Sequence, residues 1–247
     1  MVLKRSTLSI LALAGIMSMF FLASVALAAA PVLFGGATMG GGYVTLVSDG
    51  SDLDPSNDFS GASFSDANGT TFGALTTLST DYNVTDDNCG GGSPRFSIRI
   101  DTDGDNVSNG SIHVAIGPSP GFTGCTAGWQ STGNFIGNND AGRYDFSAFG
   151  GSPFTTYSNA PASVLAGTVL GISVVVDGSW SAAATGGDGE QTILIDNTDI
   201  NGVMHDFTPP PANKDECKNG GWMTFTSPSF KNQGQCVSFV VSHNPNN

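Results

Sequence analysis

Apolar and polar residues alternate most clearly in two neighbouring stretches of the chain. In 95–100 and again in 111–116, every second residue is a large aliphatic or aromatic one. A period of two places these side chains on one face of an extended segment. The opposite face then carries Arg95, Arg99 and His113. The pattern predicts two strands, each with one buried and one wet face.

Further strands are predicted between clusters of Gly, Asp, Asn and Ser, which are the residues that favour turns. They cover 43–47, 72–78, 169–177, 191–196 and 201–207. The segment 160–167 suggests a single helical turn. This number and spacing of strands favours an all-β fold in which two antiparallel sheets pack as a β-sandwich.

The ends of the chain differ from this middle part. Residues 1–28 read as a signal peptide, because two basic residues precede an apolar run that closes on Ala26-Leu27-Ala28. An uncleaved leader of this length would instead anchor the protein in a membrane. We expect cleavage and no membrane insertion after it. The protein would then be extracellular, either released or associated with the cell surface.

Three units follow the leader. A β-sandwich domain occupies 31–207, and Thr208-Pro209-Pro210-Pro211 forms a stiff linker because consecutive prolines favour extended geometry. The tail, 212–247, is too short to hold a core without a cross-link or docking.

The four cysteines are Cys89, Cys125, Cys217 and Cys236. Three pairings are open, and we expect Cys89 with Cys125 and Cys217 with Cys236, because each bridge closes a loop within one unit. Buried free thiols are the alternative, which export disfavours. No CxxC spacing indicates a zinc or redox site.

Charge excludes some partners. Without the leader the chain has 6 basic and 21 acidic residues, a net charge of −15, which disfavours nucleic acid and anionic membranes. Only two of the acids are Glu, and the remaining Asp residues favour turns over helices.

One acidic segment has the ligand order of a calcium loop. Carboxylates stand at the first, third and fifth positions, a backbone carbonyl at the seventh and an amide side chain at the ninth, supplied by Asp101, Asp103, Asp105, Val107 and Asn109. The segment resembles the calcium repeats of thrombospondin type 3. It differs in having Asn106 where Gly is usual and Ile112 where an acid closes the site. A structural calcium ion would need another donor, and a plain polar hairpin loop is the alternative.

Signatures of enzymes are absent from the sequence. It has no GxSxG, HExxH, P-loop or GxGxxG after a strand, and its three histidines are isolated. A glycosidase needs two carboxylates at a defined separation, but the acids lie in turn-like segments that favour a solvated surface. We therefore assign no catalytic residue.

Aromatic residues in polar, glycine-rich segments suggest a different chemistry, since a flat ring with a polar tip can stack on a sugar. The candidates are Trp129, Tyr144, Tyr157 and Trp180. The alternative is that these rings cover the ends of the sandwich.

Two resemblances add to this picture. The segment 191–202, an apolar run followed by Asp-Asn and another strand, is similar to the closing strands of jelly-roll carbohydrate-binding modules. This likeness implies a sandwich of the jelly-roll type. The tail segments Cys217-Lys-Asn-Gly-Gly-Trp222 and Phe230-Lys-Asn-Gln-Gly-Gln-Cys236-Val-Ser-Phe-Val240 resemble a C-terminal motif of exported bacterial proteins of unknown role. That motif implies bacterial export.

These observations favour a secreted, non-catalytic binding or surface-associated protein whose ligand is a polysaccharide or a cell-surface glycan. Aromatic faces would stack on sugar rings while polar turns supply hydrogen bonds. A structural matrix or adhesive subunit without a sugar site is the second hypothesis. A polysaccharide-cleaving enzyme is the third. The sequence leaves the oligomeric state open.

Overall fold

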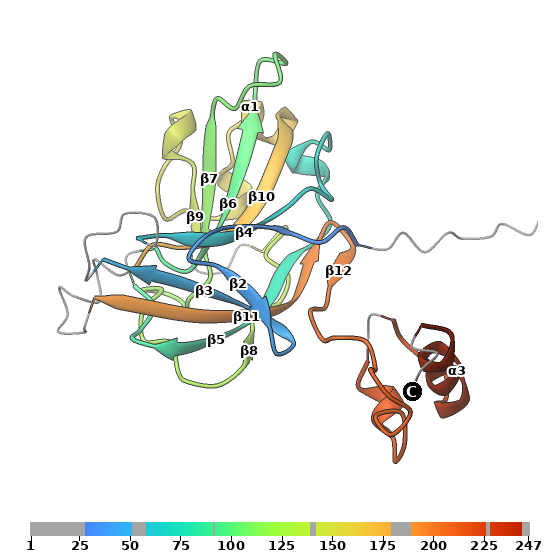
Figure 1. Ribbon diagram of the computed structural model, residues 1–247. Coiled ribbons are helices and arrows are strands. Elements are labelled where there is room, and N and C mark those ends of the chain that lie inside the picture. Colours follow the sequence, from blue (N-terminus) through green and yellow to red (C-terminus); the bar gives the residue numbers. More distant parts are fainter. Residues whose placement is uncertain are drawn as a thin grey trace, which may run out of the picture.

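The alternating segments form strands that pair into two antiparallel sheets (Figure 1). The computed structural model describes residues 28–50, 58–90, 92–138, 142–178, 189–225 and 228–243. Sheet A contains, in spatial order, β1 (Val32–Gly35), β4 (Ser60–Phe64), β10 (Thr168–Val176), β6 (Arg95–Asp101), β7 (Gly110–Ala115) and β9 (Tyr144–Asp145). Sheet B contains β2 (Thr38–Gly40), β3 (Tyr43–Asp49), β11 (Glu190–Ile200), β5 (Leu78–Asp86) and β8 (Gln130–Ser131), and β12 (Val203–His205) pairs with the end of β11.

The order of the strands is that of a jelly roll. If β3 to β8, β10 and β11 are counted as strands one to eight, sheet B reads one-eight-three-six and the centre of sheet A reads two-seven-four-five. Two Greek keys wound into two sheets produce this order. The fold expected from the sequence, a two-sheet sandwich of jelly-roll type, is therefore confirmed.

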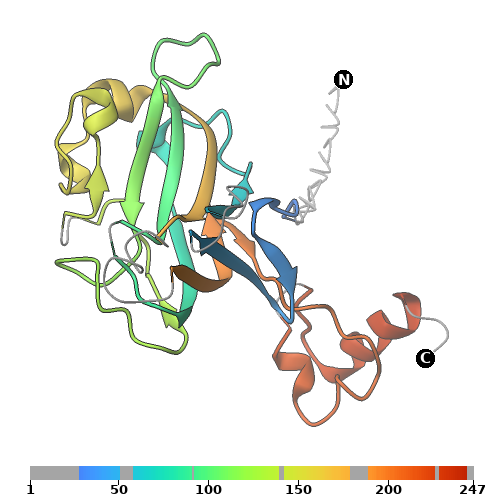
Figure 2. The same ribbon diagram turned by 60° about the vertical axis from the view of Figure 1, so that its left-hand side comes forward.

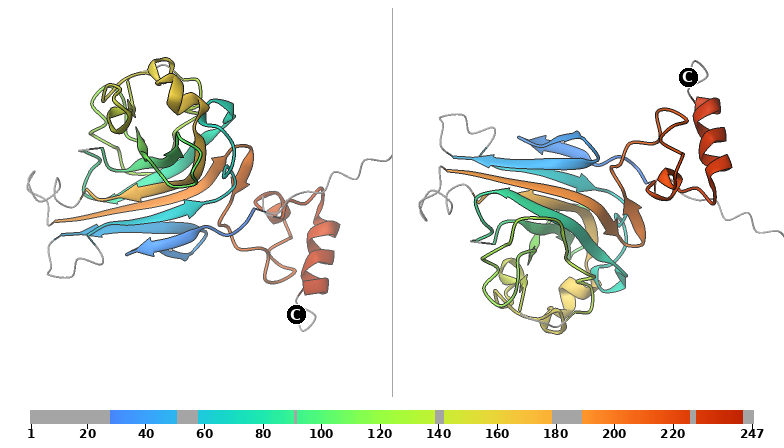
Figure 3. Two further views of the ribbon diagram at one scale, coloured as in Figure 1. Left: turned by 90° about the horizontal axis from the view of Figure 1, so that it is seen from above. Right: turned by 90° about the horizontal axis from the view of Figure 1, so that it is seen from below.

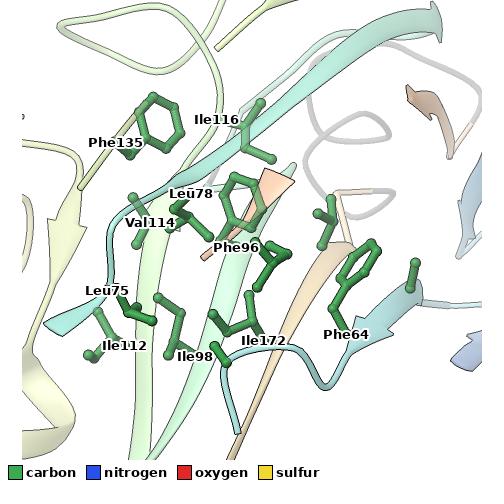
Figure 4. Close-up of a cluster of buried hydrophobic side chains, with 14 of the residues drawn as sticks. Phe64, Leu75, Leu78, Phe96, Ile98, Ile112, Val114, Ile116, Phe135 and Ile172 are labelled. Carbon is green, nitrogen blue, oxygen red and sulfur yellow. The ribbon is translucent and has the colours of Figure 1, made fainter. Parts of the chain in front are cut away.

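The core lies between the two sheets, which Figure 3 shows edge-on as stacked layers. Inward residues of β6 and β7, such as Phe96, Ile98 and Ile112, are fully buried. In Figure 4 their side chains point towards Phe64, Leu78 and Ile172 from the neighbouring strands and towards Phe135 from a loop. The alternation in 95–100 and 111–116 thus marks a real buried face. Burying each such side chain contributes about 1.5–3 kcal/mol.

The structure corrects one predicted strand. Segment 72–78 is mostly not extended: Phe72–Ala74 is a short 3-10 helix, η1, and β5 begins only at Leu78. Phe72 and Leu75 are both buried, and the Leu75 N–H donates to the Phe72 carbonyl at 3.2 Å. Apolar residues three positions apart on one 3-10 turn pack into the core here, where the sequence pattern predicted a strand.

The remaining predicted elements are present with shifted ends. The helical turn is α1 (Ala162–Ala166), the strand at 191–196 extends to Ile200, and the strand at 201–207 shrinks to β12. Two further 3-10 helices, η2 (Ser147–Phe149) and η3 (Tyr157–Asn159), lie between β9 and α1.

Both expected disulfides form. Cys89 bonds Cys125 within the sandwich, and Cys217 bonds Cys236 within the tail. The tail holds η4 (Gly221–Met223) and α3 (Gln233–His243), and Figures 1 and 2 show it beside the sandwich. All the described members of its small hydrophobic cluster are tail residues.

The leader, 1–28, lies outside the described residues except for Ala28. Within the part of the chain that the structure describes, no helix has the length and apolar character needed to cross a bilayer.

Candidate functional site

The outer face of sheet B carries a pair of aromatic rings contributed from its two sides. Tyr43 begins β3, and Trp129 directly precedes β8, while β11 and β5 lie between those strands. The ring centroids are 6.2 Å apart, and their planes are inclined by 54°. Because three strand spacings separate β3 from β8, the two rings must lean towards each other across the sheet. Trp129 is 48% exposed.

Local backbone geometry makes room for these rings. The β2–β3 turn contains Gly41 at φ +65°, and a Cβ atom there would lie only 3.2 Å from the Tyr43 ring. On the other side, the Gly128 N–H donates to Asn83 Oδ1 at 2.9 Å, which ties the residue before Trp129 to β5. Each ring therefore has a glycine close to it in the chain: Gly128 directly precedes Trp129, and Gly41 stands two positions before Tyr43.

Two carboxylates lie on the same face, in the middle of the sheet. Asp196 of β11 is directly opposite Asp81 of β5. Asn197, at φ +45°, donates from Nδ2 to Asp81 Oδ2 at 3.0 Å, and the Phe207 N–H donates to Asp196 Oδ1 at 3.0 Å. Like charges opposite one another destabilise a sheet, so these hydrogen bonds partly offset an unfavourable pairing.

Burial raises the pKa of the Asp196 carboxyl above its ordinary value. The Phe207 and Asn197 backbone N–H groups oppose this shift, whereas the neighbouring Asp206 and Asp81 charges add to it. The Asp196 carboxyl therefore holds its proton to a higher pH than an ordinary aspartate does.

The site continues into a cavity of about 660 Å³ between the sandwich and the tail. Gly40 and Gly42 from the β2–β3 hairpin line it, together with Asp206 and Phe207, which adjoin Asp196. Most other lining residues are apolar, among them Met39, Met204, Pro209 and Phe239. Residues 28–31 also line it, so this volume applies with Ala28, the last residue of the predicted leader, in place. It is in the range typical of cavities that bind organic ligands.

This arrangement offers stacking and hydrogen bonding side by side. An exposed indole face can pack on the apolar face of a sugar ring, and the Asp81–Asp196 pair can accept hydrogen bonds from hydroxyl groups. The sequence does not predict a ligand role for Asp81, Asp196 or Tyr43. Its one signal here is the Asp-Asn pair at 196 and 197, which belongs to the segment that resembles the closing strands of jelly-roll modules.

The structure removes Tyr144 from the predicted ligand set. Its side chain is fully buried, its ring stacks on Phe146 at 5.6 Å, and its hydroxyl donates to the Phe135 carbonyl. Tyr157 is half-buried and packs on Phe72 and Tyr144, and burial raises its pKa. These two rings belong to the packing of the sandwich. Trp180 lies outside the described residues.

The predicted calcium loop joins β6 to β7 and projects from the end of the sandwich in Figures 1 and 2. Carboxylate oxygens of Asp101, Asp103 and Asp105 lie within 4.8 Å of one another. Asp101 accepts the N–H groups of Asp103, Gly104 and Asn106 at 2.7–3.0 Å. These bonds, that of Gly104 foremost, lower the pKa of the Asp101 carboxyl. Asn106 adopts the left-handed conformation, φ +64°, in place of Gly.

The rest of the loop is arranged around these acids. The Asn109 side chain accepts the Thr102 N–H at 2.6 Å and donates to Asp103 Oδ2 at 3.1 Å, while the Val107 N–H donates to Asp105 Oδ1. The donor chemistry suits a hard cation, since all the converging atoms are oxygens. Ile112 at the twelfth position is fully buried in the core, so no ligand comes from there.

Comparisons of this chain with protein-family models, with curated proteins and with solved structures found no match. The assignment of function therefore rests on the geometry of the site.

Proposed function

We propose that the protein binds carbohydrate on the outer face of sheet B. The observation that carries this proposal is the exposed Trp129 ring, paired with Tyr43 on the face of sheet B where Asp81 and Asp196 stand opposite each other. Aromatic rings next to a small number of hydrogen-bonding groups are the usual composition of a sugar site. The adjoining cavity extends this surface, so that a polysaccharide or glycan chain can lie along it.

The proposed setting is extracellular. Two disulfides are consistent with an oxidising compartment, and the leader supplies a route of export. A calcium ion in the β6–β7 loop, held by Asp101, Asp103 and Asp105, would act as a structural element far from the aromatic pair in sequence. Its two positive charges would offset most of the repulsion among these three neighbouring carboxylates.

The second hypothesis, a structural matrix or adhesive subunit, meets an obstacle at the sheet edges. The edge strands β1, β2, β8 and β9 contain four, three, two and two residues. Short edge strands reduce pairing between sheets of different molecules. Assembly through sheet edges is therefore the less favoured function for the described part of the chain.

A glycan array and affinity electrophoresis on soluble polysaccharides test the proposal. Trp129→Ala should weaken retention by about tenfold or more, as expected for a central tryptophan of a binding site. Phe59→Ala is a matched control, because Phe59 is 46% exposed but packs against Phe34 beside β1, in sheet A. Absence of retention on every glycan, or equal losses in both variants, would reject the proposal.

The same incubations distinguish binding from cleavage. The Asp81–Asp196 pair, with one carboxyl of raised pKa, is the described pair that a polysaccharide-cleaving enzyme would use. Soluble product that disappears in Asp196→Asn would show an enzyme. Retention without product identifies a binding protein.

A further inference from the structure

The two sheets of the sandwich differ in charge. After the leader the chain has three arginines, and all of them lie in or next to strands of sheet A: Arg95 and Arg99 in β6, and Arg143 directly before β9. The strands of sheet B contain no lysine or arginine but six acidic residues. The remaining basic residues are lysines of the tail. The sheet that carries the aromatic pair is therefore the acidic one.

The charges of Asp81 and Asp196 are not compensated by a cation. Both carboxylates accept hydrogen bonds from neutral groups, Asp81 from the Asn197 side chain and Asp196 from the Phe207 N–H. Neither acid forms an ion pair with a residue that the structure describes. Asp206 brings a third negative charge close enough to raise the pKa of Asp196. This face therefore has an excess of negative charge that a cationic ligand would relieve.

The carboxylate of Asp81 is available on the same face as the aromatic pair. Side chains two positions apart on a strand share a face, so Asp81 points to the same side as Asn83, which accepts the Gly128 N–H next to Trp129. Such neighbours are about 6–7 Å apart along the strand. Asp81 Oδ1 accepts no hydrogen bond from the described residues. An oligosaccharide is longer than this spacing, so one ligand can stack on Trp129 and also contact Asp81.

We infer that this face binds an amino sugar polymer, whose glucosamine-type units carry free ammonium groups. The inference rests on the proposed carbohydrate function and specifies the class of sugar. An ammonium group offers three charge-assisted donors and can bridge Asp81 and Asp196, whose charges otherwise repel each other. The same cation is attracted to the faces of tryptophan and tyrosine rings. Stacking requires a sugar ring, and the uncompensated charges require its amine.

Other ligands match these charges less well. Uronic acids and sulfated sugars would bring further negative charge to a face that already has an excess of it. Neutral sugars can stack on Trp129, but they would displace water from Asp81 and Asp196 without supplying a countercharge. A lysine-rich peptide has the charge, but it lacks the flat ring that packs on an indole. Only an amino sugar combines both properties.

Three oligomers of equal length test the inference on the full chain by isothermal titration calorimetry. Chitosan, chitin and cellulose oligomers carry an amine, an acetamide and a hydroxyl group, respectively, at the same ring carbon. In mildly acidic buffer of low ionic strength, where the amines are protonated, the chitosan oligomer should bind about tenfold more tightly than either of the others. Added salt should reduce this advantage, because Asp81 and Asp196 are only half-buried.

The outcomes separate this inference from the proposed function. Equal affinity for the three oligomers would overturn the inference and leave the carbohydrate function intact. Absence of binding to the chitosan oligomer would also overturn it, while retention of another glycan on the array would still support carbohydrate binding. A lysine oligomer of equal charge provides a further control. If it bound as tightly as the chitosan oligomer, the face would attract any polycation and the assignment of an amino sugar would be wrong.

Matched variants locate the charge that the ligand contacts. Asp81→Asn removes one charge and keeps an oxygen that can accept the Asn197 hydrogen bond, so the fold should be retained. It should weaken binding of the chitosan oligomer about fivefold, and leave the weaker binding of the neutral oligomers unchanged. Asp145→Asn is the matched control, because Asp145 is also half-buried but lies in β9 of sheet A. Equal weakening in both variants would contradict the inference.

A variant of the aromatic pair distinguishes a specific site from attraction to the whole acidic chain. Trp129 is 48% exposed, so Trp129→Ala should leave the core intact. It should weaken binding of the chitosan oligomer about tenfold, because the sugar ring loses its stacking partner, and leave the weak binding of the lysine oligomer unchanged. Undiminished binding of the chitosan oligomer in Trp129→Ala would contradict the inference.

Discussion

Removing the Cys217–Cys236 bridge should bring the tail close to unfolding and leave the sandwich folded. Among the described tail residues, only the two half-cystines and Val240 are buried in its cluster, and the rings of Trp222 and Phe230 pack around them. No described residue of the tail belongs to the main core between sheets A and B. The two hydrophobic clusters are therefore separate, and the smaller one has little apolar area to stabilise it.

The size of the effect follows from the length of the closed loop. The two cysteines are 19 positions apart, and a cross-link over such a loop contributes about 3 kcal/mol by restricting the unfolded chain. A unit of this size rarely has more than about 3–5 kcal/mol of stability in total. Without the bridge, the folded and unfolded tail should differ by about 2 kcal/mol or less.

Hydrogen exchange of backbone amides measures this in the double variant Cys217→Ala/Cys236→Ala. Amides of α3 should lose protection, while those of β6 and β7 keep theirs. The matched control, Cys89→Ala/Cys125→Ala, removes a bridge over 36 positions and should cost the sandwich about 4 kcal/mol. Undiminished protection of α3, or a parallel loss in β6 and β7, would refute the division into two units.

Three further perturbations probe the loop, the carboxylate pair and the core. Chelation should lower the melting temperature, and Asp103→Ala should abolish that response; equal melting with and without chelator would reject the calcium site. Folding raises the pKa of Asp196 above its ordinary 3.8, so the free energy of unfolding falls as pH rises from that value through the folded pKa. Asp196→Asn should therefore stabilise the protein at neutral pH. Melting curves across pH should show a smaller loss of stability in this variant. Phe96→Ala empties a fully buried position and should cost about 3–5 kcal/mol in denaturant unfolding, whereas a cost below about 1 kcal/mol would contradict the assigned core.

Local patterns predicted the fold well where one strand face is buried and the other is wet. The stretches 95–100 and 111–116 alternate strictly because β6 and β7 lie against the opposite sheet with only their inward residues. The predicted strand at 72–78 was wrong because Phe72, Leu75 and Leu78 also face the core, but from a 3-10 turn that leads into a strand. Apolar residues three apart satisfy a core in either conformation, so composition alone could not distinguish them.

Aromatic side chains were harder to assign, because exposure depends on the neighbours that the fold supplies. Tyr144 lies in a two-residue strand and Trp129 directly precedes another, both in polar surroundings. Tyr144 is nevertheless fully buried, whereas Trp129 is 48% exposed. Tyr144 faces inward on β9 next to Phe146 and Tyr157. With such a short strand, the sequence contains no alternation from which the direction of the ring could be read.

The aromatic pair could not be predicted from local sequence, because the order of the strands in the sheet brings its two rings together. Tyr43 lies in the first of the eight jelly-roll strands and Trp129 directly before the sixth, so nothing local links them. The return of β11, the eighth strand, between β3 and β5 places Asp196 opposite Asp81, between the two strands next to which the rings lie. The Asp-Asn pair of β11 that resembled a family motif thus acquires a physical role. Asp196 supplies a carboxylate to the face, and Asn197, in a left-handed conformation, orients the other one.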